Sequence, residues 1–146
     1  MAITLKVVNQ KEFDARLKKQ ERGTNRNVIK VINTIANEIR NIAVTSILQN
    51  PRAGAKVTRY NPKRTINISR AGDPPASDLG FLANQIVVKI DANGYGADII
   101  SNAKYSEALE FGTIKMAARP FMQPAAEQSR KKYEQQLTKA IRDGLK

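Results

Sequence analysis

The sequence predicts an α+β fold in which an antiparallel β-sheet packs against a long N-terminal helix and a C-terminal helix. Three observations predict it: a long run of apolar residues at helical spacing, two β-branched runs around an Asn-Gly turn, and an amphipathic run at the end. The length of 146 residues suffices for one modest core, so we expect a single domain covering residues 1–146.

The first elements are short. Residues 3–7 alternate apolar and polar side chains, which predicts a half-buried strand. Phe13 and Leu17 then lie one turn apart in residues 10–22, which predicts a short helix that Gly23 ends.

A long helix is predicted next, because apolar residues recur at steps of three and four. These residues are Val28, Ile32, Ile35, Ala36, Ile39, Ile42, Ala43 and Ile47. Pro51 closes the segment. A helix of roughly 25 residues would be about 37 Å long, which is more than a small core requires. It is either a plain core helix, which we favour for its N-terminal two-thirds, or in part a seam against a neighbouring chain.

Residues 51–80 have the composition of an extended arm, with four of the six prolines and little apolar content. KVTRY and RTINIS predict two strands joined around Asn61-Pro62-Lys63. A Pro-Pro connector follows, and Ser77 or Asp78 is expected to cap a short helix over LGFLANQ. The candidate contact residues of this basic arm are Arg52, Lys56, Arg59, Tyr60, Lys63, Arg64 and Arg70.

The second half predicts a hairpin and a final helix. IVVKI and ADIIS flank an Asn93-Gly94 turn, where positive φ is inexpensive. One face of the last helix is expected to carry Ala126, Tyr133, Leu137, Ala140 and Ile141.

Composition excludes several kinds of site. The chain has no histidine and no cysteine, so nucleophile–histidine pairs, histidine or thiolate metal sites and disulfides are excluded. The first ten residues lack the layout of a secretory signal, no apolar run is long enough for a membrane span, and we expect no cofactor.

The net charge of +12 is concentrated in the first half of the chain. Residues 1–70 carry fifteen Lys or Arg and four Asp or Glu, whereas residues 71–146 carry ten and nine. A basic half indicates attraction to a polyanion, either nucleic acid or an acidic protein surface. Scattered surface lysines that serve only solubility are the alternative.

Glu107 and Glu110 are the one candidate for acid–base chemistry. Their spacing of three would place both carboxylates on one helical face. The alternative, which we favour, is that each neutralises a nearby cation such as Lys115 or Arg119.

Residues 105–125 concentrate glycine, proline and large apolar residues. Gly112 is expected to adopt a conformation that a Cβ would forbid. Pro120 and Pro124 fit at or before the first turn of the last helix. Met116, Phe121 and Met122 are expected to cap the core in part, with some of them left for a partner.

The order of these motifs resembles the neck or tail-completion proteins of long-tailed bacteriophages, a family of minor tail and head–tail joining components. The matching elements from residue 105 onward are Tyr105, Glu110-Phe111-Gly112-Thr113, Lys115-Met116, Arg119-Pro120-Phe121 and Pro124-Ala125. Upstream they are Gly72-Asp73-Pro74-Pro75-Ala76, Asp78-Leu79-Gly80-Phe81-Leu82 and Ile86. The chain departs from the family at Leu79, where threonine is usual, and the resemblance covers about residues 60–145.

The resemblance implies a structural virion protein without catalytic activity that joins head to tail by ring assembly, with six copies expected. Its partners would be itself and other neck or tail proteins, with non-specific DNA contact possible, and its location the virion, after assembly in the host cytoplasm. The subunit interface it suggests comprises Glu110, Phe111, Gly112, Lys115, Met116, Arg119, Pro120 and Phe121. The alternative function is a small basic nucleic-acid-binding protein that dimerises through its long helix.

Overall fold

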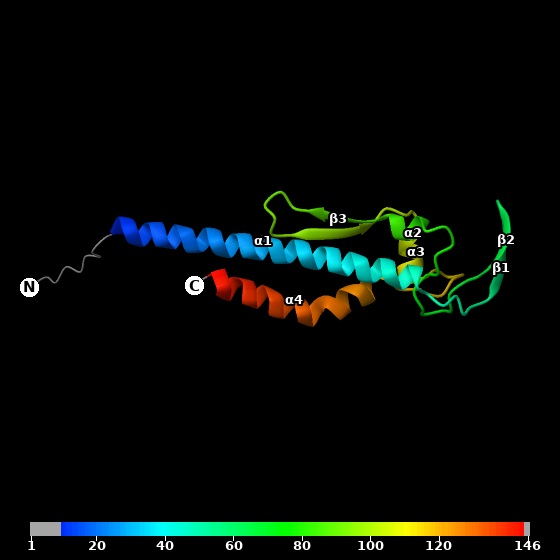
Figure 1. Ribbon diagram of the computed structural model, residues 1–146. Helices are drawn as coiled ribbons and strands as arrows, with labels where there is room; N and C mark the ends of the chain where they lie inside the picture. Colours follow the sequence, from blue (N-terminus) through cyan, green and yellow to red (C-terminus); the bar gives the residue numbers. More distant parts are fainter. Residues whose placement is uncertain (1–9, 145–146) are drawn as a thin grey trace, which may run out of the picture.

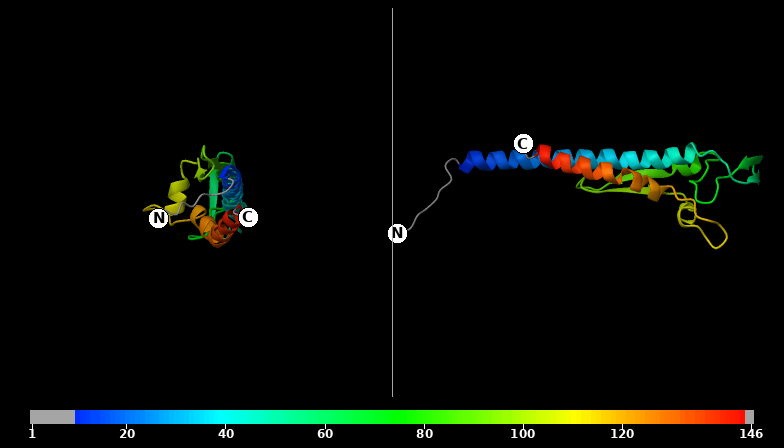
Figure 2. Two further views of the ribbon diagram at one scale, coloured as in Figure 1. Left: turned by 90° about the vertical axis from the view of Figure 1, so that its left-hand side faces the viewer. Right: turned by 90° about the horizontal axis from the view of Figure 1, so that it is seen from below.

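The computed structural model describes residues 10–144, and the strand expected at residues 3–7 lies outside them. The fold is α+β, as predicted, and the molecule is an elongated rod built around one helix (Figure 1). The C-terminal helix lies along one side of this central helix and a β-hairpin along another. A second hairpin stands out at one end of the rod, opposite the N-terminal end of the central helix (Figures 1 and 2).

The central helix α1 runs from Gln10 to Leu48 without interruption, so the predicted break at Gly23 is wrong. A glycine inside a helix costs only about 1 kcal/mol relative to alanine, which packing can offset. Here the C-terminal end of the last helix lies against α1, since a Cβ added at Gly23 would meet the Gly144 carbonyl at 3.8 Å. The helix has 39 residues instead of the roughly 25 expected from the periodicity.

Two separate two-stranded antiparallel sheets make up the β-structure. Strands β1 (Lys56–Tyr60) and β2 (Lys63–Asn67) form the hairpin of the arm, and Arg59 lies opposite Arg64. Both strands were predicted, and the turn between them is Asn61-Pro62, with its peptide bond in the cis form.

The other hairpin joins β3 (Ile86–Ile90) to β4 (Ala97–Ser101) and packs on α1. The expected turn residue Gly94 has a φ of 77°, and a Cβ there would meet the Ile29 side chain of α1 at 3.0 Å. Gly94 is therefore needed both for the turn and for the close approach of the turn to α1.

A short helix, α2 (Phe81–Asn84), precedes β3. Its N-cap is Gly80, which makes no side-chain cap, so the expected cap by Ser77 or Asp78 is wrong. Ser77 accepts a hydrogen bond from the Gly80 N–H at 3.1 Å, but Gly80 lies before the first residue of α2. The Asp78 carboxylate binds Arg64 and not the start of α2.

The last two helices are α3 (Ser106–Phe111) and α4 (Met122–Gly144). Helix α4 runs antiparallel to α1, and its buried positions are Ala125, Ser129, Ala140 and Gly144. The predicted apolar face is therefore partly wrong, because Ala126 and Ile141 are exposed. Small side chains line the contact instead, and at Gly144 a Cβ would lie 2.4 Å from the Thr24 Cα.

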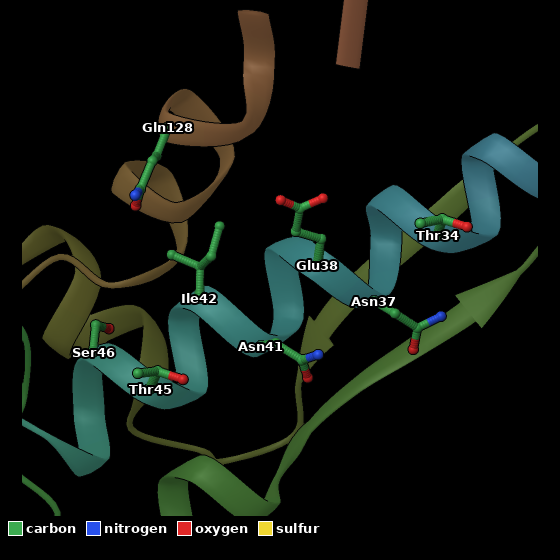
Figure 3. Close-up of a pocket in the computed structure, with 8 residues that line it drawn as sticks. All are labelled: Thr34, Asn37, Glu38, Asn41, Ile42, Thr45, Ser46 and Gln128. Atoms are coloured by element: carbon green, nitrogen blue, oxygen red, sulfur yellow. The ribbon is translucent and has the colours of Figure 1, made fainter. Parts of the chain in front are cut away.

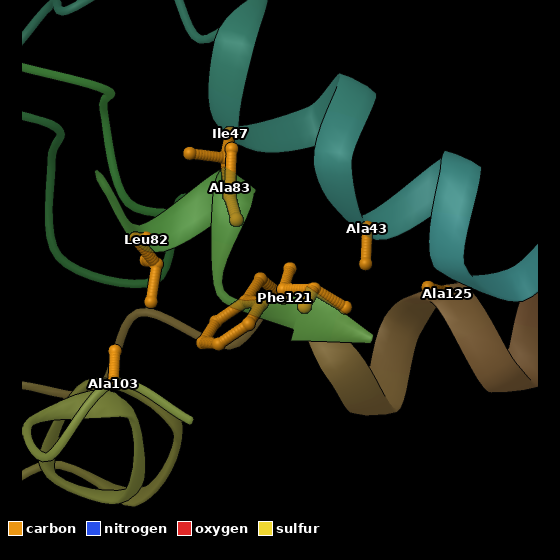
Figure 4. Packing of buried hydrophobic residues seen from close by; sticks show 8 residues of the cluster. Ala43, Ile47, Leu82, Ala83, Ala103, Phe121 and Ala125 are labelled. Atoms are coloured by element: carbon orange, nitrogen blue, oxygen red, sulfur yellow. The ribbon is translucent and has the colours of Figure 1, made fainter. Parts of the chain in front are cut away.

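The core lies where α1, α2, β3 and the start of α4 meet (Figure 4). Phe121, Ile47 and Ile86 are its largest fully buried side chains. Complete burial of each is worth about 1.5–3 kcal/mol. The core thus fixes the end of the rod from which the arm and the α3–α4 connection emerge.

Candidate interaction surfaces

Glu110 joins α3 to the start of α4. Its Oε2 accepts hydrogen bonds from the N–H groups of Phe121 at 2.9 Å and Met122 at 3.1 Å, and its Oε1 accepts one from Gln123 at 2.8 Å. A helix leaves its first N–H groups without partners and carries partial positive charge at this end, so a carboxylate satisfies both needs. No local sequence pattern predicts this contact, because the partners lie eleven to thirteen residues apart.

This contact gives Glu110 a role that neither sequence-based interpretation of the glutamates had named. Both carboxylate oxygens of Glu110 bind backbone N–H groups, whereas Glu107 is exposed at the start of α3. In the described part of the chain Glu110 forms no ion pair with Lys115 or Arg119, so the expectation that it neutralises one of these cations is wrong, and its charge faces the start of α4 instead. Among residues 10–144, no cluster of three or more acidic side chains is placed to hold a metal ion.

A tight turn separates α3 from α4. The N–H of Thr113 donates to the Met116 carbonyl at 2.8 Å, and the Met116 N–H donates back at 3.2 Å. Gly112 precedes the turn with φ 77° and ψ 179°, and a Cβ there would lie 2.8 Å from the Ala118 N. The expectation that Gly112 adopts a conformation forbidden to other residues is confirmed. The turn presents Ile114 with its side chain fully exposed.

The residues predicted for a subunit interface fall into three groups. Phe121 is 1% exposed in the core, so its side chain serves the fold of this chain (Figure 4). Met116, Arg119 and Pro120 are half-buried, with Glu110 and Gly112 shaping the connection. Phe111 and Lys115 are exposed, and the Phe111 side chain is 74% exposed.

Further large apolar side chains lie exposed at this end of the rod. We name as the tip surface the residues Leu79, Phe81, Tyr105, Phe111 and Ile114, which are all exposed. The rings of Phe81 and Tyr105 contact each other with centroids 6.3 Å apart. Leu79 and Phe81 were not predicted as interface residues, although a helix as short as α2 buries only one side, here Leu82 and Ala83.

A groove of about 570 Å³ separates the tip surface from the arm. Val57, Arg59 and Ile68 of the arm line one side of it. Leu79, Phe81, Tyr105, Leu109 and Met116 are among the residues that line the rest. Arg119 lies in the groove too, and its buried Nε has no hydrogen-bond partner.

The cations of the arm divide into two sets. Three arginines are engaged within the chain: Arg64 pairs with Asp78, Arg52 donates to the Ser77 carbonyl, and Arg70 donates to the Ala53 carbonyl at the base of the hairpin. Arg64 donates from Nε at 3.1 Å to one oxygen of Asp78 and from Nη2 to the other. This hydrogen bonding lowers the pKa of the Asp78 carboxyl and raises the pKa of Arg64, and the charges of Arg59 and Arg52 lower the pKa of Asp78 further.

The other cations of the arm are Lys56, Arg59 and Lys63, which are exposed. No hydrogen bond or ion pair joins their side chains to any residue in the described part of the chain. They are the members of the predicted contact set that remain available to a partner, together with Tyr60, which is 80% exposed.

A second concavity, of about 670 Å³, runs along the polar side of α1 beside α4 (Figure 3). Thr34, Asn37, Asn41 and Thr45 of α1 line it, and Gln128 of α4 faces them. Its one acid, Glu38, accepts a hydrogen bond from Lys132 at 2.5 Å. Neutral amides and hydroxyls without a paired base offer hydrogen bonds but no acid–base chemistry.

The apolar stripe of α1 is covered by elements of its own chain. Ile35, Ala36, Ala43 and Ile47 are buried, and α4 and the β3–β4 hairpin pack on α1. The core-helix interpretation, which we favoured for the N-terminal two-thirds, therefore fits the stripe from Ile35 to Ile47 best, because Val28 and Ile32 nearer the N-terminus are only half-buried. In the described part of the chain, only the segment before Gly23 extends past the end of α4 (Figure 1).

Comparison with known proteins found no match: no family model, curated protein sequence or solved structure matches the chain. None of the helices between residues 10 and 144 combines the length and the apolar character needed to cross a bilayer.

Proposed function

We propose that this chain is a structural virion protein of a tailed bacteriophage, a neck or tail-completion subunit that joins head to tail by assembling into a ring. The observation that carries the proposal is the tip surface. Five large apolar side chains are exposed around one end of a small protein, and Leu79, Phe111 and Ile114 are each more than 70% exposed. Large apolar side chains exposed together at one end of a protein are typical of a protein–protein interface.

The tip surface is held in a defined shape, which favours recognition over chance exposure. Glu110 fixes α3 against the start of α4, and Gly112 allows the Thr113–Met116 turn to fold back on itself. Interfaces bind more tightly when their parts are ordered before contact, because less conformational entropy is lost. These residues are also the ones that carry the resemblance to the phage family.

The other end of the rod has a different shape. In the described part of the chain, helix α1 continues from Gly23 toward Gln10 past the end of α4, whereas the tip surface and the arm form the opposite end (Figure 1). Different surfaces at the two ends of one chain favour head-to-tail contacts, which close into rings when the rotation allows.

Replacement of two exposed tip residues tests the proposal. In a phage that carries this coding sequence, the double variant Phe111→Ser/Ile114→Ser should lower the yield of infectious particles at least about tenfold. Loss of one interface anchor costs about 2 kcal/mol or more, and a ring repeats that loss at every contact. The matched control is Tyr95→Ser/Ile141→Ser, which removes two exposed side chains away from the tip, in the β3–β4 turn and near the end of α4.

Two measurements complete the test. Circular dichroism should show that both double variants remain folded, because all four side chains are exposed. Mass spectrometry of purified particles should find about six copies of the chain in each, as a six-fold ring requires. Normal titres from the tip variant, or mature particles that lack the chain, would refute the proposal.

A further inference from the structure

The β1–β2 hairpin has two faces of different character. Residues paired across the strands share a face, so Val57, Ile66, Arg59 and Arg64 lie together. This is the side that lines the groove and pairs with Asp78. We call the opposite side the outer face; it carries Lys56, Thr58, Tyr60, Lys63, Thr65 and Asn67.

All six residues of the outer face are exposed, and none is acidic. Lys56 lies opposite Asn67, Thr58 opposite Thr65, and Tyr60 opposite Lys63. The two threonine hydroxyls lie 3.4 Å apart at the centre of the face. Residues 51–70 contain no Asp or Glu, and the nearest acid that the structure assigns to the arm, Asp78, is bound to Arg64 on the other face. The positive charge of the outer face is therefore not neutralised within the described chain.

We propose that this outer face binds the phosphate backbone of duplex DNA without reading its sequence. Lysine, threonine, asparagine and tyrosine side chains are the ordinary donors to phosphate oxygens at protein–DNA interfaces. The inference goes beyond ring assembly and does not depend on it, because a monomer has the complete face.

The dimensions of the hairpin favour duplex DNA. Lys56 and Lys63 lie four residue rows apart, which is about 13 Å along the strands at 3.3 Å per residue. The major groove of B-DNA is about 12 Å wide and admits a two-stranded β-ribbon. Both outer edges of this hairpin are unpaired, and it stands clear of the rod (Figure 1). A ribbon entering the groove would bring one lysine toward each phosphate strand.

An acidic protein surface is the alternative partner for the same lysines, because carboxylates and phosphates both pair with an ammonium group. Arg52, Arg64 and Arg70 are already engaged within the chain, so Lys56 and Lys63 carry the unpaired charge of the outer face. The fit of the hairpin to the width of the major groove is what favours the duplex.

Salt-dependent binding tests the inference. A fluorescein-labelled duplex of random sequence is titrated with the full chain, and its anisotropy is followed over a series of NaCl concentrations. Each phosphate contact contributes about 0.9 to the slope of log K against log salt concentration. Lys56→Gln/Lys63→Gln should therefore lower the slope by about 1.8 and weaken binding at low salt. Neither lysine has a structural partner, so circular dichroism should be unchanged.

The matched control is Lys30→Gln/Lys104→Gln, which removes the same charge from exposed positions on the body. It should leave the slope nearly unchanged. Equal losses in the two double variants would show that only the net charge matters and would overturn the inference. Absence of binding to the duplex in 20 mM salt would do the same.

Two further probes separate the other possible partners. A single strand of the same length should bind more weakly than the duplex, and Tyr60→Ala should have little effect on the duplex. Tighter binding of the single strand, lost in Tyr60→Ala, would instead identify a stacking site for unpaired bases and refute the duplex. A poly-glutamate peptide that binds the outer face more tightly than duplex DNA would refute the inference in favour of an acidic protein.

Discussion

The carboxylate of Glu110 accepts a hydrogen bond from the backbone N–H of Phe121 at 2.9 Å. This bond joins the α3–α4 connection to a residue at the centre of the core. Phe121 is the largest buried side chain, and the two N–H groups that follow it also donate to Glu110. The shape of the tip surface is thereby tied to the stability of the core.

Glu110→Ala should destabilise the chain by about 1–3 kcal/mol. It removes an N-terminal cap and a favourable charge at the start of α4, which are worth about 0.5–2 and 0.3–1 kcal/mol. Urea unfolding followed by circular dichroism measures the change. Glu107→Ala is the matched control, and it should shift stability by less than about 0.5 kcal/mol because Glu107 is exposed. Equal effects of the two substitutions would contradict the capping role.

Gly112→Ala should cost more stability than Gly80→Ala, although both glycines have positive φ. At Gly80 the new Cβ would meet only the flexible Asn84 side chain at 3.6 Å, so the cost is that of the left-handed backbone, about 1–2 kcal/mol. At Gly112 the Cβ would press on backbone atoms of Ala118 and Met116 at 2.8 and 2.9 Å. The turn would have to open, and thermal unfolding should show the larger loss at Gly112.

Truncation of Phe121 should lower the free energy of unfolding strongly, whereas truncation of Phe111 should leave it nearly unchanged. Phe121→Ala leaves a cavity in the core and should destabilise by about 3–5 kcal/mol. Phe111→Ala removes an exposed ring and should leave the free energy of unfolding within about 0.5 kcal/mol. Chemical denaturation of the purified variants distinguishes these outcomes, and a large loss for Phe111→Ala would show that its ring already packs within the monomer.

Much of the fold was predictable because its signals are local. The Asn93-Gly94 turn between two β-branched runs and the spacing of Val28 to Ile47 each depend on neighbours in the sequence. The arm hairpin was found in the same way. The failures concern contacts between distant residues. Gly23 does not end α1 because the end of α4 packs beside it, and Asp78 does not cap α2 because Arg64 binds it.

The candidate site was predictable in composition but not in arrangement. Glu110, Gly112 and Phe121 were predicted as one group of interface residues, yet each has a different role in the structure. A periodicity or a motif does not say which large side chain faces inward. Phe111 is exposed and Phe121 is buried because the backbone between them reverses direction. The arginines and lysines of the arm are likewise equivalent in a count of charge. The structure distinguishes them, because Arg64 binds Asp78 whereas the Lys63 side chain binds nothing in the described part of the chain.

The Arg64–Asp78 pair should make the anchoring of the arm depend on pH. The pKa of Asp78 is lowered in the folded state by the hydrogen bond from Arg64, so the pair stabilises the fold above the ordinary carboxyl pKa of 3.8. This contribution is lost as the pH falls below 3.8 and through the lowered pKa of the folded state. Urea midpoints of the wild type and Asp78→Asn should therefore differ at pH 6 and converge as the pH falls below 3.8.

Arg64→Gln provides the control for this convergence. Without the guanidinium, the lowered pKa of Asp78 loses its main cause, so Asp78→Asn should have little effect at either pH in that background. A gap that persists unchanged in the Arg64→Gln background would show that Asp78 acts through Arg59 or Arg52, the two other arginines whose charges reach it. In that event the groove side of the arm would be held by the combined charges of several arginines and not by the single Arg64–Asp78 ion pair.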